Sequence, residues 1–325
     1  PASLGSTGIG AGYPKKTEGG SDVEFLGRRA KNKGPDVSTE EGRSVVQAQI
    51  DDTEDVFVSS IARYRDISED KIVADFGEGG VLVGAKAVAA GEDILLAVPS
   101  HALNPMLRAL APLLKPEQGI VSACKGLEPE TGRLVHEMVE DVFGKSRKFA
   151  AISGPTFAKE VGLGLPTAVT VASIDELYAD RIVNALHGGG FRAYSSRDVI
   201  GVEIGGSAKN VMAIGVGIAD GLGLGANTRA AMITRGLAEI MRLGEALGGR
   251  METFMGLAGL GDLVLTCTDD QSRNRRLGLA LAKGKTLDQA QTEIKQVVEG
   301  VRAAPEVLRL AHKHNVDMPI TEQVV

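Results

Sequence analysis

Asp93-Ile-Leu-Leu-Ala-Val-Pro99 opens the part of the chain in which strand and helix patterns alternate. A short apolar run that ends at a proline is typical of a parallel strand buried on both faces. Comparable apolar runs follow at 119–124, 149–152 and 168–172, and helical periodicity separates them at 103–114 and 133–143. This alternation predicts an α/β fold with a doubly wound parallel sheet, covering helices and right-handed crossovers.

Beyond Asp198 the pattern changes to long helical segments without further strand runs. The main candidates are 199–219, 228–247, 274–282 and 287–299. Asn227 is the predicted N-cap of the second helix, and Gly248 and Gly249 are placed to end it in a left-handed turn. The sequence therefore predicts a sheet domain at 1–197 and an all-helical domain at 198–325.

The composition suits a soluble cytoplasmic protein of two domains. The chain has 325 residues, of which 43% are hydrophobic and 42 are glycine, and its net charge is -6. This charge predicts no nucleic-acid or membrane-surface partner, so an anionic ligand needs a local basic cluster. Only two cysteines occur, which favours reduced thiols. No apolar stretch approaches the roughly 20 residues of a membrane span, and no signal peptide is recognisable.

The first ninety residues should carry the cofactor turn of a Rossmann-like dinucleotide-binding domain, G-x-G-x-x-G after an apolar strand. The nearest candidate is Gly5-Ser-Thr-Gly-Ile-Gly10, in which Thr7 replaces the middle glycine, so Gly5, Gly8, Ile9 and Gly10 are the candidate cofactor residues. A possible second strand at 22–27 ends at Arg28, which suits a 2′-phosphate and favours NADP over NAD. The alternative is that these glycines and arginines belong to loops and the surface.

Lys209 is the candidate catalytic residue. Its neighbours at helical spacing are small or apolar, namely Gly205, Gly206, Met212 and Ala213. Desolvation on such a face lowers the pKa of a lysine towards neutrality, and a lysine so tuned can exchange a proton during a reaction. The alternative is a lysine whose aliphatic stem packs along the helix while its amine reaches water.

Two further segments of the C-terminal half suggest ligand chemistry. Gly256-Leu-Ala-Gly-Leu-Gly-Asp262 is a glycine-rich bend that presents one carboxylate, which could orient Lys209 or merely cap a turn. Ser272-Arg-Asn-Arg-Arg276 begins a predicted helix with three cations, which oppose the helix dipole unless an anion binds there. A phosphate site and surface pairing with Asp269 and Asp270 both remain open for this cluster.

Two loops are predicted at the carboxyl end of the sheet, where open α/β folds bind their ligands. Lys125-Gly-Leu-Glu128 follows one predicted strand, and Ser153-Gly-Pro-Thr-Phe-Ala-Lys-Glu160 follows the next. Both loops should line one crevice. The five histidines show no metal-ligand spacing, so the sequence predicts no metal.

Taken together, these segments resemble the bacterial-type NAD(P)-dependent glycerol-3-phosphate dehydrogenases from about residue 94 to the end of the chain. The resemblance rests on eight segments in the family's order, namely Ala97-Val-Pro-Ser100, Lys125-Gly-Leu-Glu128, Ser153-Gly-Pro-Thr-Phe-Ala158, Lys209-Asn-Val, Asn227 with Thr234-Arg-Gly-Leu-Ala-Glu239, Gly256-Leu-Ala-Gly-Leu-Gly-Asp-Leu263, Ser272-Arg-Asn274 and Val297-Val-Glu-Gly300. The first ninety residues depart from the family because they lack its glycine turn in recognisable form.

The resemblance implies reversible hydride transfer between NAD(P)H and dihydroxyacetone phosphate, which gives sn-glycerol 3-phosphate for phospholipid synthesis. It implies that Lys209 donates and accepts the proton, with Lys125 and Asp262 completing the catalytic group. The implied substrate-binding residues are Lys125, Gly154, Thr156, Lys209, Asp262, Ser272, Arg273 and Asn274. The implied cofactor contacts in this region are Lys125, Ala158, Arg273, Val297 and Glu299.

Two other functions stay open at this point. One is a related hydroxyacid or 6-phosphogluconate-type dehydrogenase, against which the Ser-Arg-Asn and Gly-Leu-Gly-Asp motifs argue. The other is a non-catalytic binding protein with a degenerate cofactor site. The sequence leaves the assembly state open, with a homodimer as one candidate.

Overall fold

A computed structural model describes residues 14–16, 23–25 and 91–325 of the protein. At the N-terminal end, β1 (Pro14–Lys16) and β2 (Val23–Phe25) form an antiparallel pair. The strand predicted at 22–27 therefore exists, but it pairs with β1 in a small sheet of its own. The candidate cofactor residues Gly5, Gly8, Ile9, Gly10 and Arg28 lie outside the described residues.

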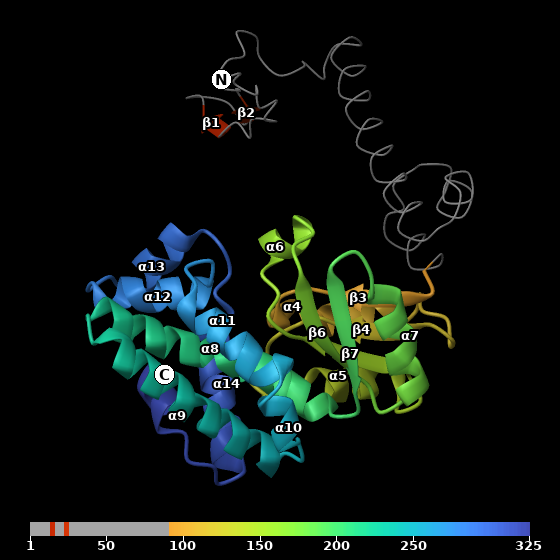
Figure 1. Ribbon diagram of the computed structural model, residues 1–325. Helices are drawn as coiled ribbons and strands as arrows, with labels where there is room; N and C mark the ends of the chain where they lie inside the picture. Colours follow the sequence, from red (N-terminus) through yellow and green to blue (C-terminus); the bar gives the residue numbers. More distant parts are fainter. Residues whose placement is uncertain (1–13, 17–22, 26–90) are drawn as a thin grey trace, which may run out of the picture. The chain divides into compact units, whose positions relative to one another are not determined.

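Among the described residues the main sheet has five strands in sequential order, shown on the right of Figure 1. They are β3 (Asp93–Leu96), β4 (Gly119–Ser122), β5 (Phe149–Ser153), β6 (Thr167–Ala172) and β7 (Phe191–Ser196). All four residues of β4 are buried, as expected for a strand covered on both faces. The four strands predicted from apolar runs are thus β3 to β6.

The sheet differs in one respect from the predicted all-parallel arrangement. β3, β4 and β5 are parallel, but β6 runs antiparallel to β5, and β7 is parallel to β6. Apolar runs indicate burial on both faces without indicating strand direction, so this reversal could not be read from them. As a consequence, the carboxyl ends of β6 and β7 lie at the opposite end of the strands from the carboxyl ends of β3 to β5.

Helices cover both faces of the sheet. On one face α4 (Ser100–Leu110) and α5 (Val135–Phe143) pack on Leu96 and Ile120. On the other face α7 (Glu176–Leu186) packs on Val121 and its neighbours through Tyr178 and Ile182. Side chains of successive residues in a strand point to opposite faces, which is why Ile120 and Val121 enter different cores. A short helix, α6 (Ala158–Gly162), follows β5.

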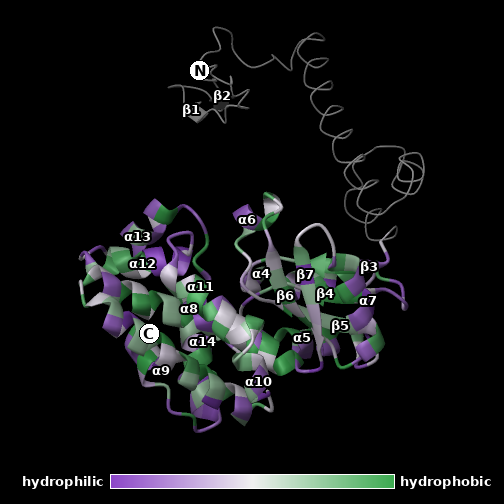
Figure 2. Ribbon diagram, viewed as in Figure 1, coloured by the Kyte–Doolittle hydropathy of each residue, from purple (hydrophilic) through white to green (hydrophobic). Residues whose placement is uncertain are grey.

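The C-terminal part is helical, as predicted, and surrounds one long central helix, α8 (Val199–Gly221). The other elements are α9 (Gly225–Ala246), α10 (Met251–Phe254), a single π-helical segment η1 (Leu257–Gly261), α11 (Asp262–Thr268), α12 (Arg273–Ala282), α13 (Leu287–Ile294), α14 (Glu299–Lys313) and α15 (Pro319–Val324). Figure 2 shows that hydrophilic residues gather on outlying helices such as α13.

α8 is the core of this helical part. It has the length and hydropathy of a membrane span, but 94% of its apolar window is buried inside the protein. Its residues Ile204, Val211 and Met212 contribute to the largest hydrophobic core of the described residues. A helix that is apolar all round is expected at the centre of a bundle, and here α9, α11, α12 and α14 cover it.

Two predicted helix boundaries are wrong. Asn227 is not an N-cap, because α9 already begins at Gly225 and Asn227 lies inside its first turn. The predicted helix 287–299 is two helices, since Lys295 adopts a left-handed conformation (φ 55°) that ends α13 before α14 begins at Glu299. The predicted end of α9 is right, because Gly248 has a φ of +94° directly after the cap Leu247.

α8 and α12 approach each other at two glycines. A Cβ atom on Gly217 would lie 2.3 Å from the backbone oxygen of Arg275, and one on Gly278 would lie 2.2 Å from that of Ile214. Neither helix can therefore accept a side chain at this crossing without moving. The crossing is important for the ligand site because α12 begins with the Ser272–Asn274 segment.

We predict that Gly217→Ala lowers the free energy of unfolding by about 1 to 3 kcal/mol, because an overpacked contact forces the two helices apart. Urea unfolding followed by circular dichroism measures this change. Gly162→Ala is the matched control, since a Cβ atom there meets nothing within 4 Å. Equal stability of the two variants would contradict the close crossing.

Candidate functional site

The candidate site lies where the carboxyl ends of β4 and β5 meet α8 and α11. Lys125 follows β4, and Gly154 and Thr156 follow β5, as the sequence predicts. The Lys125 ammonium donates to the backbone oxygen of Gly154 at 3.0 Å and to the Thr156 hydroxyl at 3.3 Å. The two predicted loops therefore lie side by side and are joined through the Lys125 ammonium.

Asp262 joins this crevice to the helical part. Its Oδ2 atom accepts from Lys125 Nζ at 2.7 Å, and its Oδ1 atom accepts from Lys209 Nζ at 2.5 Å. Lys209 also donates to the hydroxyl of Thr266 at 2.9 Å. One carboxylate is thus shared by two ammonium groups, one that follows a strand of the sheet and one on the central helix α8. The carboxylate is not a helix cap, because Asp262 is the first residue of α11 and Gly261 is the cap.

Small residues allow this arrangement to form. A Cβ atom on Gly205 would lie 2.5 Å from the backbone oxygen of Ala258 in η1, and one on Gly206 would lie 2.9 Å from Ser153 Oγ at the end of β5. The glycines one turn before Lys209 therefore let α8 contact both η1 and the sheet. Segments of π-helix are frequent at functional sites, and η1 leads directly into Asp262.

Burial sets the protonation chemistry of this group. Lys209 is only 6% exposed, and burial together with the nearby charge of Lys125 lowers its pKa to about 8, although Asp262 opposes the change. Burial also disfavours the charged form of Asp262, but the two ammonium groups outweigh this and lower its pKa. Asp262 therefore stays ionised while Lys209 can lose its proton near neutral pH.

Hydrogen bonds between two buried asparagine side chains connect the Ser272–Asn274 segment to Lys125. Asn274 donates to the side-chain oxygen of Asn210 at 2.9 Å, and it accepts from the backbone nitrogen of Gly300 at 2.9 Å. Asn210, which directly follows Lys209 in α8, donates to the backbone oxygen of Lys125 at 3.3 Å. Ser272 is the N-cap of α12 and accepts from the backbone nitrogen of Arg275.

Two arginines of the Ser272–Arg276 segment have different environments. Arg275 is buried and pairs with Asp220 and with Asp270, which is one of the two aspartates named in the alternative interpretation. Arg273 is exposed, and no carboxylate among the described residues pairs with its guanidinium group. Its charge is therefore available to a ligand at the start of α12, next to Ser272.

The other residues that the sequence predicts as cofactor contacts in this region are Glu299, Val297 and Ala158. Glu299, at the start of α14, accepts from the hydroxyl of Ser100 at 3.1 Å, and Ser100 begins the helix after β3. A Cβ atom on Gly126 would meet Ser100 at 2.7 Å. Val297 is an exposed apolar side chain shortly before Glu299, and Ala158 begins α6 after the β5 loop.

Three polar residues of the site are not among the predicted ones. Thr266 accepts from Lys209, Ser153 donates to Asp262 at 3.3 Å, and Asn210 links Lys125 to Asn274. Thr266 lies one helical turn after Asp262, a spacing that could have indicated it. Among the described residues no group of three or more His, Cys, Asp or Glu side chains could hold a metal.

A strand-rich domain with ligand loops at one sheet edge, followed by a helical domain that contributes a buried amine, defines a nicotinamide-dependent dehydrogenase of the two-domain type. Two family models match the chain, "NAD-dependent glycerol-3-phosphate dehydrogenase N-terminus" over residues 84–179 and the corresponding C-terminus over residues 198–325. The chain belongs to the NAD(P)-dependent glycerol-3-phosphate dehydrogenases, enzymes that interconvert dihydroxyacetone phosphate and glycerol 3-phosphate.

Individual relatives agree with this assignment. Glycerol-3-phosphate dehydrogenase [NAD(P)+] of Serratia proteamaculans is 56% identical over 241 residues, which are 74% of this chain and 71% of the relative. The protein of the same name from Escherichia coli K12 is 55% identical over the same coverage. The crystal structure of glycerol-3-phosphate dehydrogenase from Coxiella burnetii is 48% identical, covers 74% of this chain and 73% of its own, and superposes with a TM-score of 0.72. These matches favour neither the 6-phosphogluconate-type enzyme nor the non-catalytic protein.

Proposed function

We propose that Lys209 is the proton donor and acceptor of the hydride-transfer reaction, with Lys125 and Asp262 as its catalytic partners. The observation that carries this proposal is the shared carboxylate, which holds the amines of Lys209 and Lys125 in one crevice. Negative charge develops on the carbonyl oxygen of the substrate as hydride reaches the carbon. A protonated Lys209 can deliver its proton to that oxygen, and the charge of Lys125 stabilises it.

The remaining site residues are proposed to hold and orient the substrate. Arg273 and the free backbone N–H groups at the start of α12 would bind the phosphate, with Ser272 and Asn274 shaping that end. Gly154 and Thr156 would border the substrate on the sheet side, where they already position Lys125. The phosphate does not react, so its binding energy can be used to place the carbonyl at Lys209.

We propose that five of the described residues hold the nicotinamide end of the cofactor. Lys125, Ala158, Arg273, Val297 and Glu299 would contact it, because the start of α14 lies against the carboxyl end of β3 through the Glu299–Ser100 hydrogen bond. The exposed apolar Val297 suits a flat ring. The bound cofactor supplies or accepts the hydride. We propose NADP in preference to NAD on account of Arg28, which lies outside the described residues.

The pH dependence of the reaction tests the role of Lys209. The reduction of dihydroxyacetone phosphate needs the protonated amine, so kcat/KM should fall as pH rises through about 8, where Lys209 loses its proton. The reverse oxidation of glycerol 3-phosphate needs the neutral amine, and its kcat/KM should rise over the same range. Steady-state rates in both directions, followed by NAD(P)H absorbance, measure the two midpoints.

A charge variant sharpens this test. The carboxylate of Asp262 raises the pKa of Lys209, so Asp262→Asn should move both midpoints to lower pH. Asp288→Asn is the control, because Asp288 is exposed on α13, and its midpoints should not move. Profiles that stay flat through this range, or midpoints that ignore Asp262→Asn, would exclude Lys209 as the titrating group.

The domain boundary, the assembly state and the cellular location are also proposals. We place the domain boundary between residues 197 and 198, because Asp198 caps the long helix α8 that begins the helical part.

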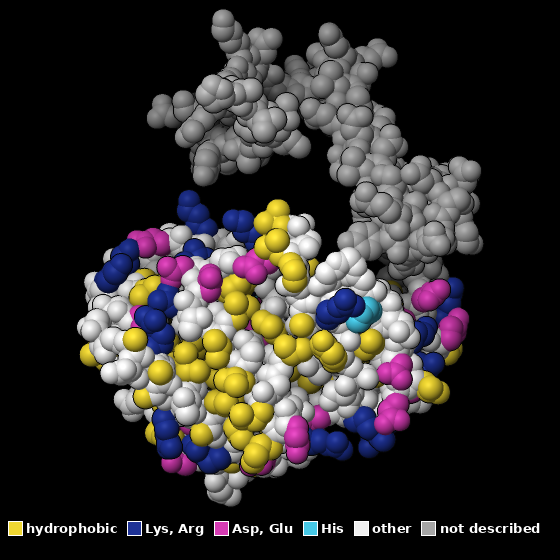
Figure 3. All heavy atoms as spheres, viewed as in Figure 1, with side chains coloured by type: hydrophobic (Ala, Val, Ile, Leu, Met, Phe, Trp, Pro, Cys, Tyr) yellow, Lys and Arg dark blue, Asp and Glu magenta, His cyan; other side chains and the backbone are white. Residues whose placement is uncertain are grey.

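We propose a homodimer, because the protein has an exposed apolar face. Met251, Met255 and Val264, on and next to α10 and α11, are 40% or more exposed. Hydrophobic side chains gather over these helices in Figure 3. A cytoplasmic location suits the two free thiols.

A further inference from the structure

A side-chain hydrogen bond outside the lysine–carboxylate group joins the sheet part to the helical part. Gln271 Nε2 donates to Glu160 Oε1 at 2.8 Å. Glu160 lies on α6, shortly after the β5 loop that contains Thr156, and Gln271 directly precedes Ser272, the N-cap of α12. The bond therefore connects the loop that positions Lys125 with the segment that is proposed to bind the phosphate.

On the helical side, a short series of hydrogen bonds relates the position of Gln271 to the start of α12. The backbone nitrogen of Gln271 donates to Asp269 Oδ1 at 2.7 Å, and that of Ser272 donates to the backbone oxygen of Asp269 at 3.1 Å. Ser272 in turn caps α12, whose first residue is Arg273. Because these bonds form one tight turn, a restraint on Gln271 also restrains Ser272 and Arg273.

On the sheet side, packing contributes little to the position of α6. None of its residues is buried, and Val161 and the nearby Leu163 are 37% and 66% exposed. Figure 1 shows α6 projecting beyond the end of the sheet. A helix in a protein is held mainly by the packing of an apolar face, which α6 lacks. Among the described residues, the bond to Gln271 is the side-chain hydrogen bond that joins α6 to another element.

We propose that Glu160 and Gln271 are positioning residues, which hold the phosphate-binding segment at the correct separation from the β5 loop. Dihydroxyacetone phosphate is a short molecule, so the groups that bind its carbonyl and its phosphate must keep a closely fixed separation. The β5 loop contacts Lys125, and the short helix after it reaches Gln271. One stretch of chain thereby relates the proposed proton-transfer group to the proposed phosphate site. The inference rests on the proposed role of Arg273.

Loss of this bond should affect the binding of the phosphate more than the chemistry. Without it, the Ser272–Arg273 segment occupies the binding-competent arrangement for a smaller fraction of the time, and the apparent affinity falls by that fraction. Glu160→Ala should therefore raise KM for dihydroxyacetone phosphate by about threefold to tenfold, the range expected for one exposed hydrogen bond to a charged acceptor. The value of kcat should stay within about twofold, because bound substrate holds the segment in place. Arg273→Ala, by contrast, should change both constants.

Steady-state kinetics with further variants test the proposal. Glu160→Gln should keep KM within about twofold of the unmodified enzyme, because its side-chain oxygen can accept the same hydrogen bond. Gln271→Ala should raise KM as Glu160→Ala does. The double variant Glu160→Ala/Gln271→Ala should raise it no further, since both single changes remove the same interaction. Unphosphorylated dihydroxyacetone should show a much smaller change in all of these variants.

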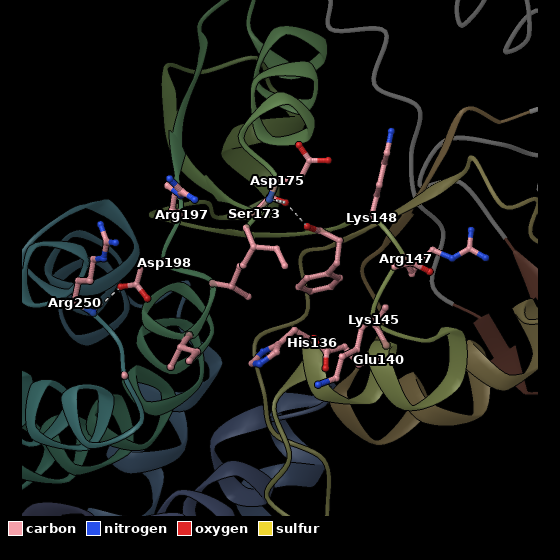
Figure 4. A pocket seen from close by; sticks show the side chains of 17 residues that line it. His136, Glu140, Lys145, Arg147, Lys148, Ser173, Asp175, Arg197, Asp198 and Arg250 are labelled. Carbon is pink, nitrogen blue, oxygen red and sulfur yellow. Dashed lines mark hydrogen bonds between the residues drawn. The ribbon is translucent and has the colours of Figure 1, made fainter.

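Glu176→Ala is the matched control. Like Glu160, Glu176 lies in the first turn of its helix, and its carboxylate has one exposed partner, Arg197, at 3.0 Å. Figure 4 shows Arg197 beside a cavity of about 410 Å³, at the opposite end of the strands from Lys125. This variant should leave KM for dihydroxyacetone phosphate unchanged.

The results separate this inference from the proposed function. An unchanged KM in Glu160→Ala, or an equal rise in Glu160→Gln, would overturn the inference even where Arg273→Ala still discriminates between the two substrates. Equal losses for both substrates in Arg273→Ala would overturn the proposed phosphate site, and this inference with it.

Discussion

Lys209→Met should lower kcat for the reduction of dihydroxyacetone phosphate by a factor of about 10² to 10⁴, the range that general acid catalysis contributes. Methionine retains most of the volume of the lysine side chain but has no proton to give. The Michaelis constant should change much less than kcat, since the lost interaction develops mainly as charge appears on the carbonyl oxygen. Steady-state kinetics with NADH and NADPH measure both constants.

The control must show that turnover is lost because the proton donor is missing and not because the fold has changed. Asp262 keeps its second partner Lys125 in this variant, so the free energy of unfolding should fall by only about 1 to 2 kcal/mol. Lys313→Met, at an exposed lysine of α14, should change neither turnover nor stability. Turnover by Lys209→Met within about threefold of the unmodified enzyme would remove Lys209 from the mechanism, because general acid catalysis contributes far more than that.

Arg273→Ala should lower kcat/KM for dihydroxyacetone phosphate by about 10²-fold or more, because a charge-assisted contact to the phosphate is lost. Unphosphorylated dihydroxyacetone should be affected much less, since it has no phosphate to bind. The decrease should appear in kcat as well as in KM, because the phosphate contact helps to place the carbonyl. The ratio of the two substrates' kcat/KM values is the quantity to compare.

Arg192→Ala is the matched control for this variant. Arg192 lies exposed on β7 and its guanidinium group is hydrogen-bonded to the ring of His187, so its removal should leave the substrate ratio unchanged. Equal losses of kcat/KM for both substrates in Arg273→Ala would show that the arginine supports the crevice without binding the phosphate.

The fold was predictable where apolar patterns are strong. The runs that became β3 to β6 and the long apolar helix α8 follow from hydrophobic periodicity alone. β7 was not predicted, because Phe191-Arg-Ala-Tyr-Ser-Ser196 contains no continuous apolar run, and Ala193 is its one buried residue. Such an edge strand has little sequence signal until the neighbouring strand β6 pairs with it.

The candidate site was predictable as separate motifs. Small residues around Lys209, a carboxylate after a glycine-rich segment and a lysine after a strand each indicate a role by residue type and position. Thr266 has only its spacing from Asp262 as a signal, and Asn210 has none, because an asparagine or a threonine inside a helix is ordinary. Their importance comes from partners that lie far away in the sequence, Asn274 for one and Lys209 for the other.

By itself the sequence determined the alternation of strands and helices, the helical second half, and the lysine, carboxylate and arginine available for the reaction, because these follow from local patterns and residue chemistry. Only the tertiary structure decided that Asp262 bridges Lys125 and Lys209, that Arg275 is paired while Arg273 is available, and that β6 reverses direction. Those features depend on which distant segments share a space, and the energies of burial and ion pairing that select them exist only once the chain is folded.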